Sequence, residues 1–373
     1  MDFSYEDEWD MIRTMVRDFA QHEVAPSAAK RDEQARFDQR LYILMAELGL
    51  TGIPWKESDG GLGADRITLS LVLEELAKSC ASTAHSLYVH SALACAPIAE
   101  FGTEEQKQIY LQPLAQGKLL GAAAEMETLN GLGQLHALRE EDTYIINGIK
   151  NMLTNAGDAD IWVIYAWTEP SLKGRGCSAF VIKKDQFGVR LGEKENTLGT
   201  RSSSMRQVHF EQCRVPASQR LGEEGDGLRI AAATLHNARS SLAAQAIGVA
   251  QAAMEAALAY ASMRKQFGKP IASQQAIAFK LANMATQIEA ARLLMYQTAC
   301  QEHPTPQVDY VPVCHFAGTT AVNVAIEALQ IFGGYGYTKD FPVERYLRDA
   351  KMLQLIETMQ EELRITISHY LQT

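Results

Sequence analysis

The sequence predicts an α+β protein with an N-terminal α-helical domain, a middle β-barrel or sandwich domain and a C-terminal four-helix bundle. Over residues 4–117, apolar side chains recur three and four positions apart, as in amphipathic helices. Residues 121–225 form short β-rich runs bounded by Gly, Asn, Asp and Pro. Beyond residue 226 the chain is helical again, with short connections. We therefore expect domains at 1–120, 121–225 and 226–373.

The first domain contains several predicted helices, and two features define them best. Residues 82–102 are apolar almost throughout, so this helix is expected to be buried. Thr103 precedes Glu104 and Glu105, which predicts a helix N-cap followed by acidic residues in the first turn. Residues 58–66 carry three glycines and predict a loop.

The second domain and the bundle follow from local pattern in the same way. Asn147–Gly148 stands between two β-rich runs, which predicts a hairpin turn there. Residues 228–268 are rich in Ala, so the first long helix of the bundle can pack closely against its neighbours. Short connections predict that four such helices run antiparallel.

Composition excludes several classes of function. The chain has 373 residues and a formal charge of −10, from 45 acidic and 35 basic residues, which argues against nucleic-acid binding. We identify no apolar run long enough to span a membrane, and the first residues lack signal-peptide and transit-peptide character. The six scattered cysteines are interpreted as small buried residues of a cytoplasmic protein, with neither disulfides nor a metal site.

One carboxylate stands in an unusual place. Glu357 lies among apolar residues of an amphipathic stretch, residues 352–362. It is either a surface residue at the edge of an apolar stripe or a carboxylate in an apolar pocket. Generic catalytic signatures such as the P-loop, HExxH and GxSxG are absent from the sequence.

Two long motifs are much more specific. They are YASMRKQFGKPIASQQAIAFKLANM at 260–284 and QIFGGYGYTKDFPVERYLRDAK at 330–351. Both closely resemble the acyl-CoA dehydrogenase family. The resemblance covers nearly the whole chain, including LEELA at 73–77 and NGIKNMLTNAGDAD at 147–160. That family has the same helix–β–helix order.

The resemblance implies an FAD-dependent oxidation of acyl-CoA thioesters to trans-2-enoyl-CoA. Electrons would then pass to an electron-transfer flavoprotein. The family's base is a Glu after an RDAK motif, and that position is Glu357. Burial in an apolar slot would make this carboxylate a stronger base. Some family members carry their base on another helix, directly before an Arg that matches Arg239. Arg239 is taken here as substrate-binding. The residue before it is Ala238, which cannot act as a base.

The resemblance also assigns residues that contact FAD. Glu125 and Thr154 match positions facing the flavin of the same subunit, and Met152 stands where the family has Trp. The remaining matches would reach the FAD of a neighbouring subunit, where Arg can bind pyrophosphate and Gly permits close approach. They are Arg264, Phe267, Gln275, Gln330, Gly333 and Gly334. A shared site of this kind implies a homotetramer, built as a dimer of dimers.

Three departures from the family pattern lie on the flavin- or acyl-facing side. They are Met152, a shortened loop over 124–135 without the family's Pro and Ser-Asp pair, and Thr358-Met359 after the base. They leave alternatives open. The chain could instead complete FAD sites on a sister subunit, act on a carrier-protein thioester, or belong with the monooxygenases and nitroalkane oxidases; retention of Glu357 disfavours this last class. Acyl chain length is not predicted.

Overall fold

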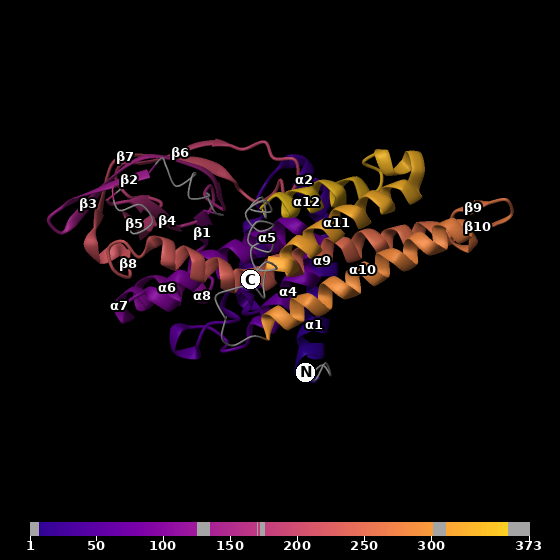
Figure 1. Cartoon of the computed structure of the whole chain (residues 1–373), viewed down its shortest axis with the longest axis horizontal. Helices are drawn as coiled ribbons and strands as arrows, with labels where there is room; N and C mark the ends of the chain where they lie inside the picture. The colour runs from indigo at the N-terminus through magenta and orange to yellow at the C-terminus, as the bar shows by residue number, and fades with distance from the viewer. Residues whose placement is uncertain (1–6, 125–134, 170, 172–175, 301–310, 357–373) are drawn as a thin grey trace, which may run out of the picture.

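The computed structural model describes residues 7–124, 135–169, 171, 176–300 and 311–356. The predicted order of helices, strands and helices is confirmed (Figure 1). The strands gather at one end of the molecule, while the β9–β10 hairpin projects from the opposite end.

The N-terminal domain is built from short helical segments packed around a common core. They are α1 (Asp7–Phe19), η1 (Ala20–Val24), α2 (Ala25–Gln34), α3 (Gln39–Glu47), η2 (Leu50–Gly52), η3 (Glu57–Asp59), α4 (Arg66–Ser79), α5 (Ala81–Tyr88), η4 (Val89–Cys95), α6 (Ala96–Phe101), α7 (Glu104–Gln106), η5 (Lys107–Leu111) and α8 (Gln112–Ala115). Every residue of 81–98 is buried, which confirms the expectation from its apolar sequence. Thr103 caps α7 as predicted, since its Oγ1 accepts from the Gln106 backbone N–H at 3.2 Å.

The middle domain is one mixed sheet, and two of its strands close it into a barrel-like ring. The strands are β1 (Gly121–Ala124), β2 (Leu135–Glu140), β3 (Thr143–Thr154), β4 (Ile161–Trp167), β5 (Cys177–Lys183), β6 (Val189–Lys194), β7 (Arg206–Pro216) and β8 (Arg220–Leu221), with η8 (Ala217–Gln219) between the last two. Both β1 and β2 pair with β3 and with β4. Trp162 and Phe180 are fully buried inside this domain.

The hairpin predicted at Asn147–Gly148 is wrong. Both residues lie inside β3, and the β2–β3 turn is formed by residues 141–142 instead, where Glu141 has φ 53°. Gly148 has φ 128° and stands at a register shift between β3 and β7. The Asn-Gly pair therefore marks a bulge in a long strand rather than a turn.

The C-terminal bundle is formed by α9 (Gly227–Met263), α10 (Gln275–Ala299), α11 (Val311–Phe332) and α12 (Val343–Ile356). Strands β9 (Lys265–Gln266) and β10 (Lys269–Pro270) and the short helix η9 (Ile271–Ser273) join the first two helices, and η10 (Gly333–Tyr337) follows α11. Helix α9 packs against the other three and against α4. A side-chain carbon at Gly248 would lie 2.3 Å from the Glu74 carbonyl oxygen, so only Gly permits this approach of α9 to α4.

Helix α9 corrects one expectation. Among the described helices it alone has the length and hydropathy of a membrane span, although 67% of its most apolar window is buried within the protein. The core helix of a water-exposed domain meets the same test, because it too is covered on all sides by apolar neighbours.

The cysteines follow the sequence interpretation except at one position. All six are free thiols, and five are buried. Cys300 is exposed because it lies just beyond the last turn of α10, where packing against the bundle ends.

Candidate functional site

The ends of β1 and β3 lie side by side, and Thr154, one of the predicted flavin-facing residues, stands at this junction. Ala123 pairs with Thr154 and Ala124 with Leu153 in antiparallel register. Thr154 is fully buried, yet its Oγ1 has no hydrogen-bond partner among the described residues. A buried hydroxyl without a partner is costly, so this atom fits a polar group of a bound ligand. This orphan hydroxyl is consistent with a flavin at this position.

Buried polar contacts fix this corner of the β domain against the N-terminal helices. Asn155 has φ 65°, and its Nδ2 donates to the carbonyl oxygens of Ser86 at 2.9 Å and Gly121 at 3.2 Å. The Gly121 backbone N–H donates to His90 Nδ1 at 3.0 Å. Burial lowers the pKa of His90 to about 4, which keeps the ring neutral and able to accept. The side chains of Asn155 and His90 thus hold the start of β1 and the end of β3 against the N-terminal helices.

Met152 is placed beside this corner with its side chain outward. It has φ 51° and is 57% exposed in the single chain. An exposed apolar side chain in this backbone conformation is consistent with contact to a ligand or a second subunit.

Two predicted residues lie outside the described residues, but their neighbours are placed. Glu125 follows Ala124, the last residue of β1, and Glu357 follows Ile356, the last residue of α12. Helix α12 packs against α9 and α11. Their roles therefore remain predictions.

Arg239 lies on α9, half-buried. Its guanidinium has no ion pair or hydrogen bond within the described part of the chain. His236, one turn earlier, has its pKa lowered to about 4 by burial and by the positive charges of Arg239 and Arg66. This side of α9 therefore presents free positive charge beside a neutral imidazole.

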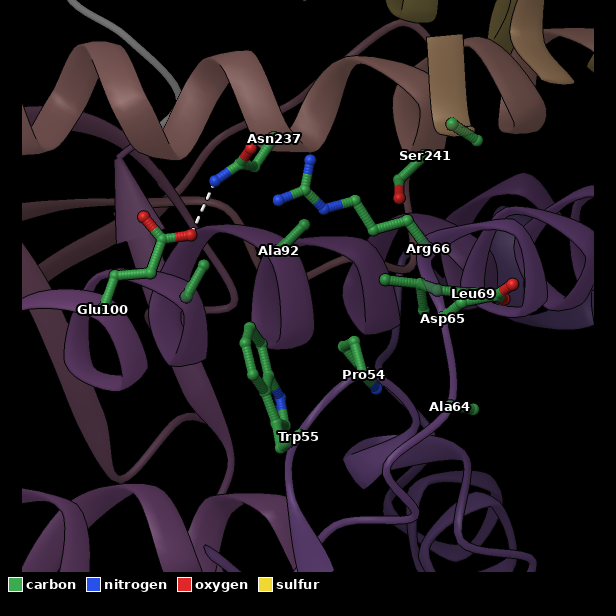
Figure 2. A pocket seen from close by; sticks show the side chains of 12 residues that line it. Pro54, Trp55, Ala64, Asp65, Arg66, Leu69, Ala92, Glu100, Asn237 and Ser241 are labelled. Carbon is green, nitrogen blue, oxygen red and sulfur yellow. Dashed lines mark hydrogen bonds between the residues drawn. The ribbon is translucent and has the colours of Figure 1, made fainter. Parts of the chain in front are cut away.

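Sequence reasoning missed a cavity between α9 and the N-terminal domain, shown in Figure 2. It has a volume of about 400 Å³ and is lined by Trp55, Arg66, Glu100 and Asn237, among others. Asn237 Nδ2 donates to Glu100 Oε1 at 2.6 Å. Burial raises the pKa of Glu100, although the nearby Arg66 opposes this. No motif signals the cavity, since its residues come from four separate segments of the chain.

The residues predicted to contact the FAD of a neighbouring subunit all lie at the far end of the bundle, and all are exposed. They are Arg264, Phe267, Gln275, Gln330, Gly333 and Gly334. Phe267 is 92% exposed, and Gly333 has φ 59°, the left-handed conformation in which a glycine often ends a helix. An added side-chain carbon at Gly333 or Gly334 would meet nothing within 4 Å. The surface above these glycines is open for contact.

Aromatic packing holds this far end together. Tyr260 of α9 stacks on Phe332 of α11 with ring centroids 4.2 Å apart. Phe341 packs against both rings, at 5.9 Å from Tyr260 and 5.0 Å from Phe332. Arg264 and Gly333 flank this stack in sequence, so they share one end of the bundle. That end is opposite the β domain (Figure 1).

Three domain families match successive parts of the chain. They are the acyl-CoA dehydrogenase N-terminal domain at residues 6–118, middle domain at 123–213 and C-terminal domain at 225–371. The chain belongs to the acyl-CoA dehydrogenase family. It is accordingly an oxidoreductase acting on CH–CH donors, with FAD as its cofactor.

Individual members of the family are similar over their full length. A short-chain specific acyl-CoA dehydrogenase of Clostridium acetobutylicum is 42% identical over 99% of both chains. Butyryl-CoA dehydrogenase from Megasphaera elsdenii is 39% identical, with a TM-score of 0.96 over 100% of both chains. A chain solved in a study of the electron-transferring flavoprotein of Acidaminococcus fermentans is 40% identical, with a TM-score of 0.96 over 100% of this chain and 99% of that one.

One structural neighbour differs in its carrier. The prolyl acyl carrier protein oxidase AnaB is 30% identical, with a TM-score of 0.94 over 99% of this chain and 100% of that chain. The acyl-CoA dehydrogenase fold is therefore compatible with either type of thioester.

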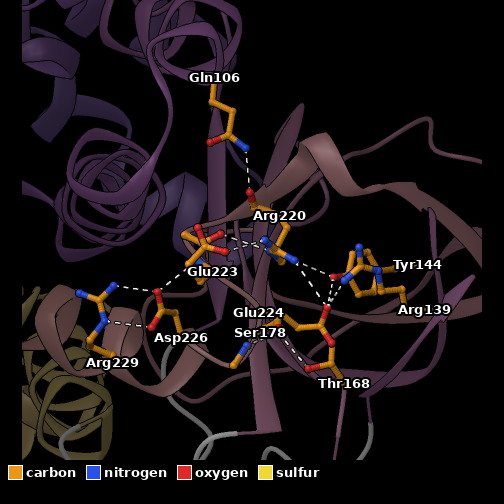
Figure 3. Close-up of polar contacts among 12 residues, drawn as sticks. Gln106, Arg139, Tyr144, Thr168, Ser178, Arg220, Glu223, Glu224, Asp226 and Arg229 are labelled. Atoms are coloured by element: carbon orange, nitrogen blue, oxygen red, sulfur yellow. Dashed lines mark hydrogen bonds and ion pairs between the residues drawn. The ribbon is translucent and has the colours of Figure 1, made fainter. Parts of the chain in front are cut away.

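A polar network fixes the β domain to the start of α9 in this family member (Figure 3). Arg220 donates to the Tyr144 hydroxyl at 2.8 Å, and that hydroxyl donates to Glu224 Oε2 at 2.6 Å. Asp226, the residue before α9, accepts from Arg229 at 2.8 Å. These contacts orient the helix that carries Arg239, and none involves a predicted site residue.

Proposed function

We propose that this chain oxidises acyl-CoA thioesters to trans-2-enoyl-CoA and passes the electrons to an electron-transfer flavoprotein. The observation that carries the proposal is the buried, unpartnered Thr154 hydroxyl where β1 and β3 meet, in a chain that matches the family over all three domains. Similarity to butyryl-CoA dehydrogenase and to the Acidaminococcus chain supports the substrate and the electron acceptor.

In the proposed reaction Glu357 is the base. Its carboxylate removes the α-proton of the thioester while the β-hydrogen leaves as hydride, and a C=C bond forms between the two carbons. Bound FAD supplies the hydride acceptor. Thr154 would hold the flavin ring through its hydroxyl, and the cation of Arg239 would lie on the acyl-CoA side of α9. Glu125 and Met152 would complete the flavin-facing surface.

The second half of the FAD site would come from another copy of the chain. The exposed residues near β9–β10 and η10 lie at the end of the bundle opposite the β domain, which carries Thr154, so one chain does not bring them together (Figure 1). Arg264 and Gln330 would bind the adenosine side of the neighbour's FAD. This arrangement supports a homotetramer built as a dimer of dimers, and we expect it in the cytoplasm.

A carrier-protein thioester is the second candidate substrate. The altered loop at 124–135 and the similarity to a carrier-protein oxidase favour it. An FAD-completing role beside a sister chain is a further alternative.

Anaerobic bleaching of bound flavin separates these possibilities. The purified protein should be yellow with near-stoichiometric FAD, and one of butyryl-, octanoyl- or palmitoyl-CoA should bleach it. Bleaching only by a butyryl carrier protein would favour the second substrate. A colourless protein that restores FAD binding to a sister chain would contradict the proposal.

A further inference from the structure

A basic pocket opens between the N-terminal helices and the β domain. One of its lining residues, Arg206, pairs with Leu153 in the sheet, next to Thr154. Its volume is about 630 Å³, within the range of small-molecule sites. Two acidic side chains line it, Asp38 and Asp158. Six basic side chains line it, namely Lys30, Arg31, Arg36, Arg40, Lys194 and Arg206. A formal excess of four positive charges is notable in a chain whose total is −10.

Arg31 is the most deeply buried of these cations, at 6% exposure. Its guanidinium donates to Ser27 Oγ, to the Val24 carbonyl oxygen at 3.1 Å and to Thr83 Oγ1 at 3.5 Å. These acceptors are neutral, and no carboxylate pairs with Arg31 in the part of the chain that the structure describes. A buried charge without a counter-ion is unfavourable, so an anion in the pocket would stabilise it.

Lys194 and Arg206 present further positive charge from the β domain. Burial lowers the pKa of Lys194. The negative charge of Asp158 acts to raise this pKa, and the positive charge of Arg206 acts to lower it. Lys194 Nζ donates to the Ala35 carbonyl oxygen. Arg206 Nη1 donates to the Gly192 carbonyl oxygen at 3.0 Å, and its buried Nε has no partner among the described residues. Arg206 therefore has a free donor.

The acidic lining residues do not neutralise the pocket. Asp38 is the N-cap of α3, and its Oδ1 accepts from the backbone N–H groups of Arg40 at 3.1 Å and Leu41 at 3.4 Å. Arg40 pairs with Glu23. Lys30 and Arg36 are exposed, and their side chains make no ion pair or hydrogen bond with another described residue. Most of the positive charge is therefore available to a ligand.

We infer that this pocket binds a phosphate-bearing small molecule, with Arg31 and Arg206 as the buried donors and Lys30, Arg36 and Lys194 around them. Guanidinium groups match phosphate oxygens with two parallel N–H donors, and Lys adds a point charge. None of the described FAD- or acyl-facing residues lines this pocket, and we assign it a ligand other than FAD.

Isothermal titration of the FAD-loaded enzyme tests the inference, with inorganic pyrophosphate, ADP and adenosine as probes. Pyrophosphate or ADP should bind with one site per chain, and adenosine should not bind. The double substitution Lys30→Gln and Arg36→Gln should weaken binding at least about tenfold. The loss of one charged contact to phosphate can by itself weaken binding by nearly this much. Both side chains are exposed, so the fold should be retained.

The matched control removes two exposed arginines elsewhere, with the same change in net charge. It is Arg190→Gln with Arg214→Gln, whose side chains are 62% and 66% exposed. Binding to this control should equal that of the wild type. No saturable binding of pyrophosphate or ADP, equal loss in both double variants, or adenosine binding as tightly as ADP would each overturn the inference.

Discussion

The Thr200 backbone N–H donates to Oδ1 of Asp349 at 2.7 Å, which joins the β domain to α12. Asp349 is 3% exposed. The preceding residue, Arg348, binds Asp32 of α2 with both terminal nitrogens, at 3.0 and 2.7 Å. Two adjacent residues thus fix α12 to both other domains, about two turns before the helix reaches Ile356. The position of Ile356, the residue before Glu357, depends on these contacts.

Asp349 should give the stability of the protein a pH dependence. Burial raises its pKa to about 6, whereas its ordinary value is 3.8. Between these values the folded protein binds more protons than the unfolded chain, so the free energy of unfolding falls as pH rises. Asp349→Asn keeps the acceptor for Thr200 and removes the titration. Its unfolding free energy relative to wild type should rise from pH 4 to pH 7 by on the order of 1–3 kcal/mol.

Urea denaturation at pH 4, 5, 6 and 7 measures this difference. Asp185→Asn, at an exposed position, is the control and should differ from wild type by a constant amount. A constant difference for Asp349→Asn as well would show that Asp349 does not titrate in this window.

Glu357→Gln tests the proposed base. The variant should keep its fold and its FAD, because the substitution preserves size and removes only the ability to accept a proton. Reduction of bound flavin by the best acyl-CoA should slow by at least about a hundredfold, the usual scale for a general base. Stopped-flow absorbance of the flavin measures the rate. A variant that reduces flavin at the wild-type rate would show that another residue is the base.

Arg264→Gln tests the shared FAD site. Loss of a charge-assisted contact to pyrophosphate should weaken FAD binding by about 10- to 100-fold, from about 1.5–3 kcal/mol. Lys265→Gln, the exposed neighbour in β9, is the control and should retain FAD. Flavin absorbance after dialysis gives the FAD content, and sedimentation gives the oligomeric state. A stable wild-type monomer that retains FAD would contradict a site shared between subunits.

Met152 and the altered loop should make FAD easier to lose than is usual for the family. Met lacks the aromatic ring of the family's Trp. If the flavin buries that ring, its aromatic surface contributes roughly a few kcal/mol to binding. Met152→Trp should therefore slow the loss of FAD during dialysis, whereas Met152→Leu should not. Tight stoichiometric FAD in the wild type, with fast turnover of butyryl-, octanoyl- or palmitoyl-CoA, would show that these differences have no effect.

The sequence by itself determined the order of the domains, the buried helix at residues 82–102 and the Thr103 cap. Each depends on side-chain period or on a local backbone preference, which a short stretch of chain expresses wherever it lies. The motifs at 260–284 and 330–351 identified the family, and the resemblance predicts the site residues.

Tertiary structure alone decided which of these residues meet. Strand pairing, which depends on neighbours distant in sequence, drew Asn147–Gly148 into β3 and set Ala123 opposite Thr154. Packing of the long helices carried β9 and η10, which border Arg264 and contain Gly333, to the end opposite the β domain. The basic pocket likewise has no motif, because Arg31 and Arg206 belong to different domains and become neighbours only when those domains pack. Local preference does not specify such contacts, since they depend on the burial of whole surfaces.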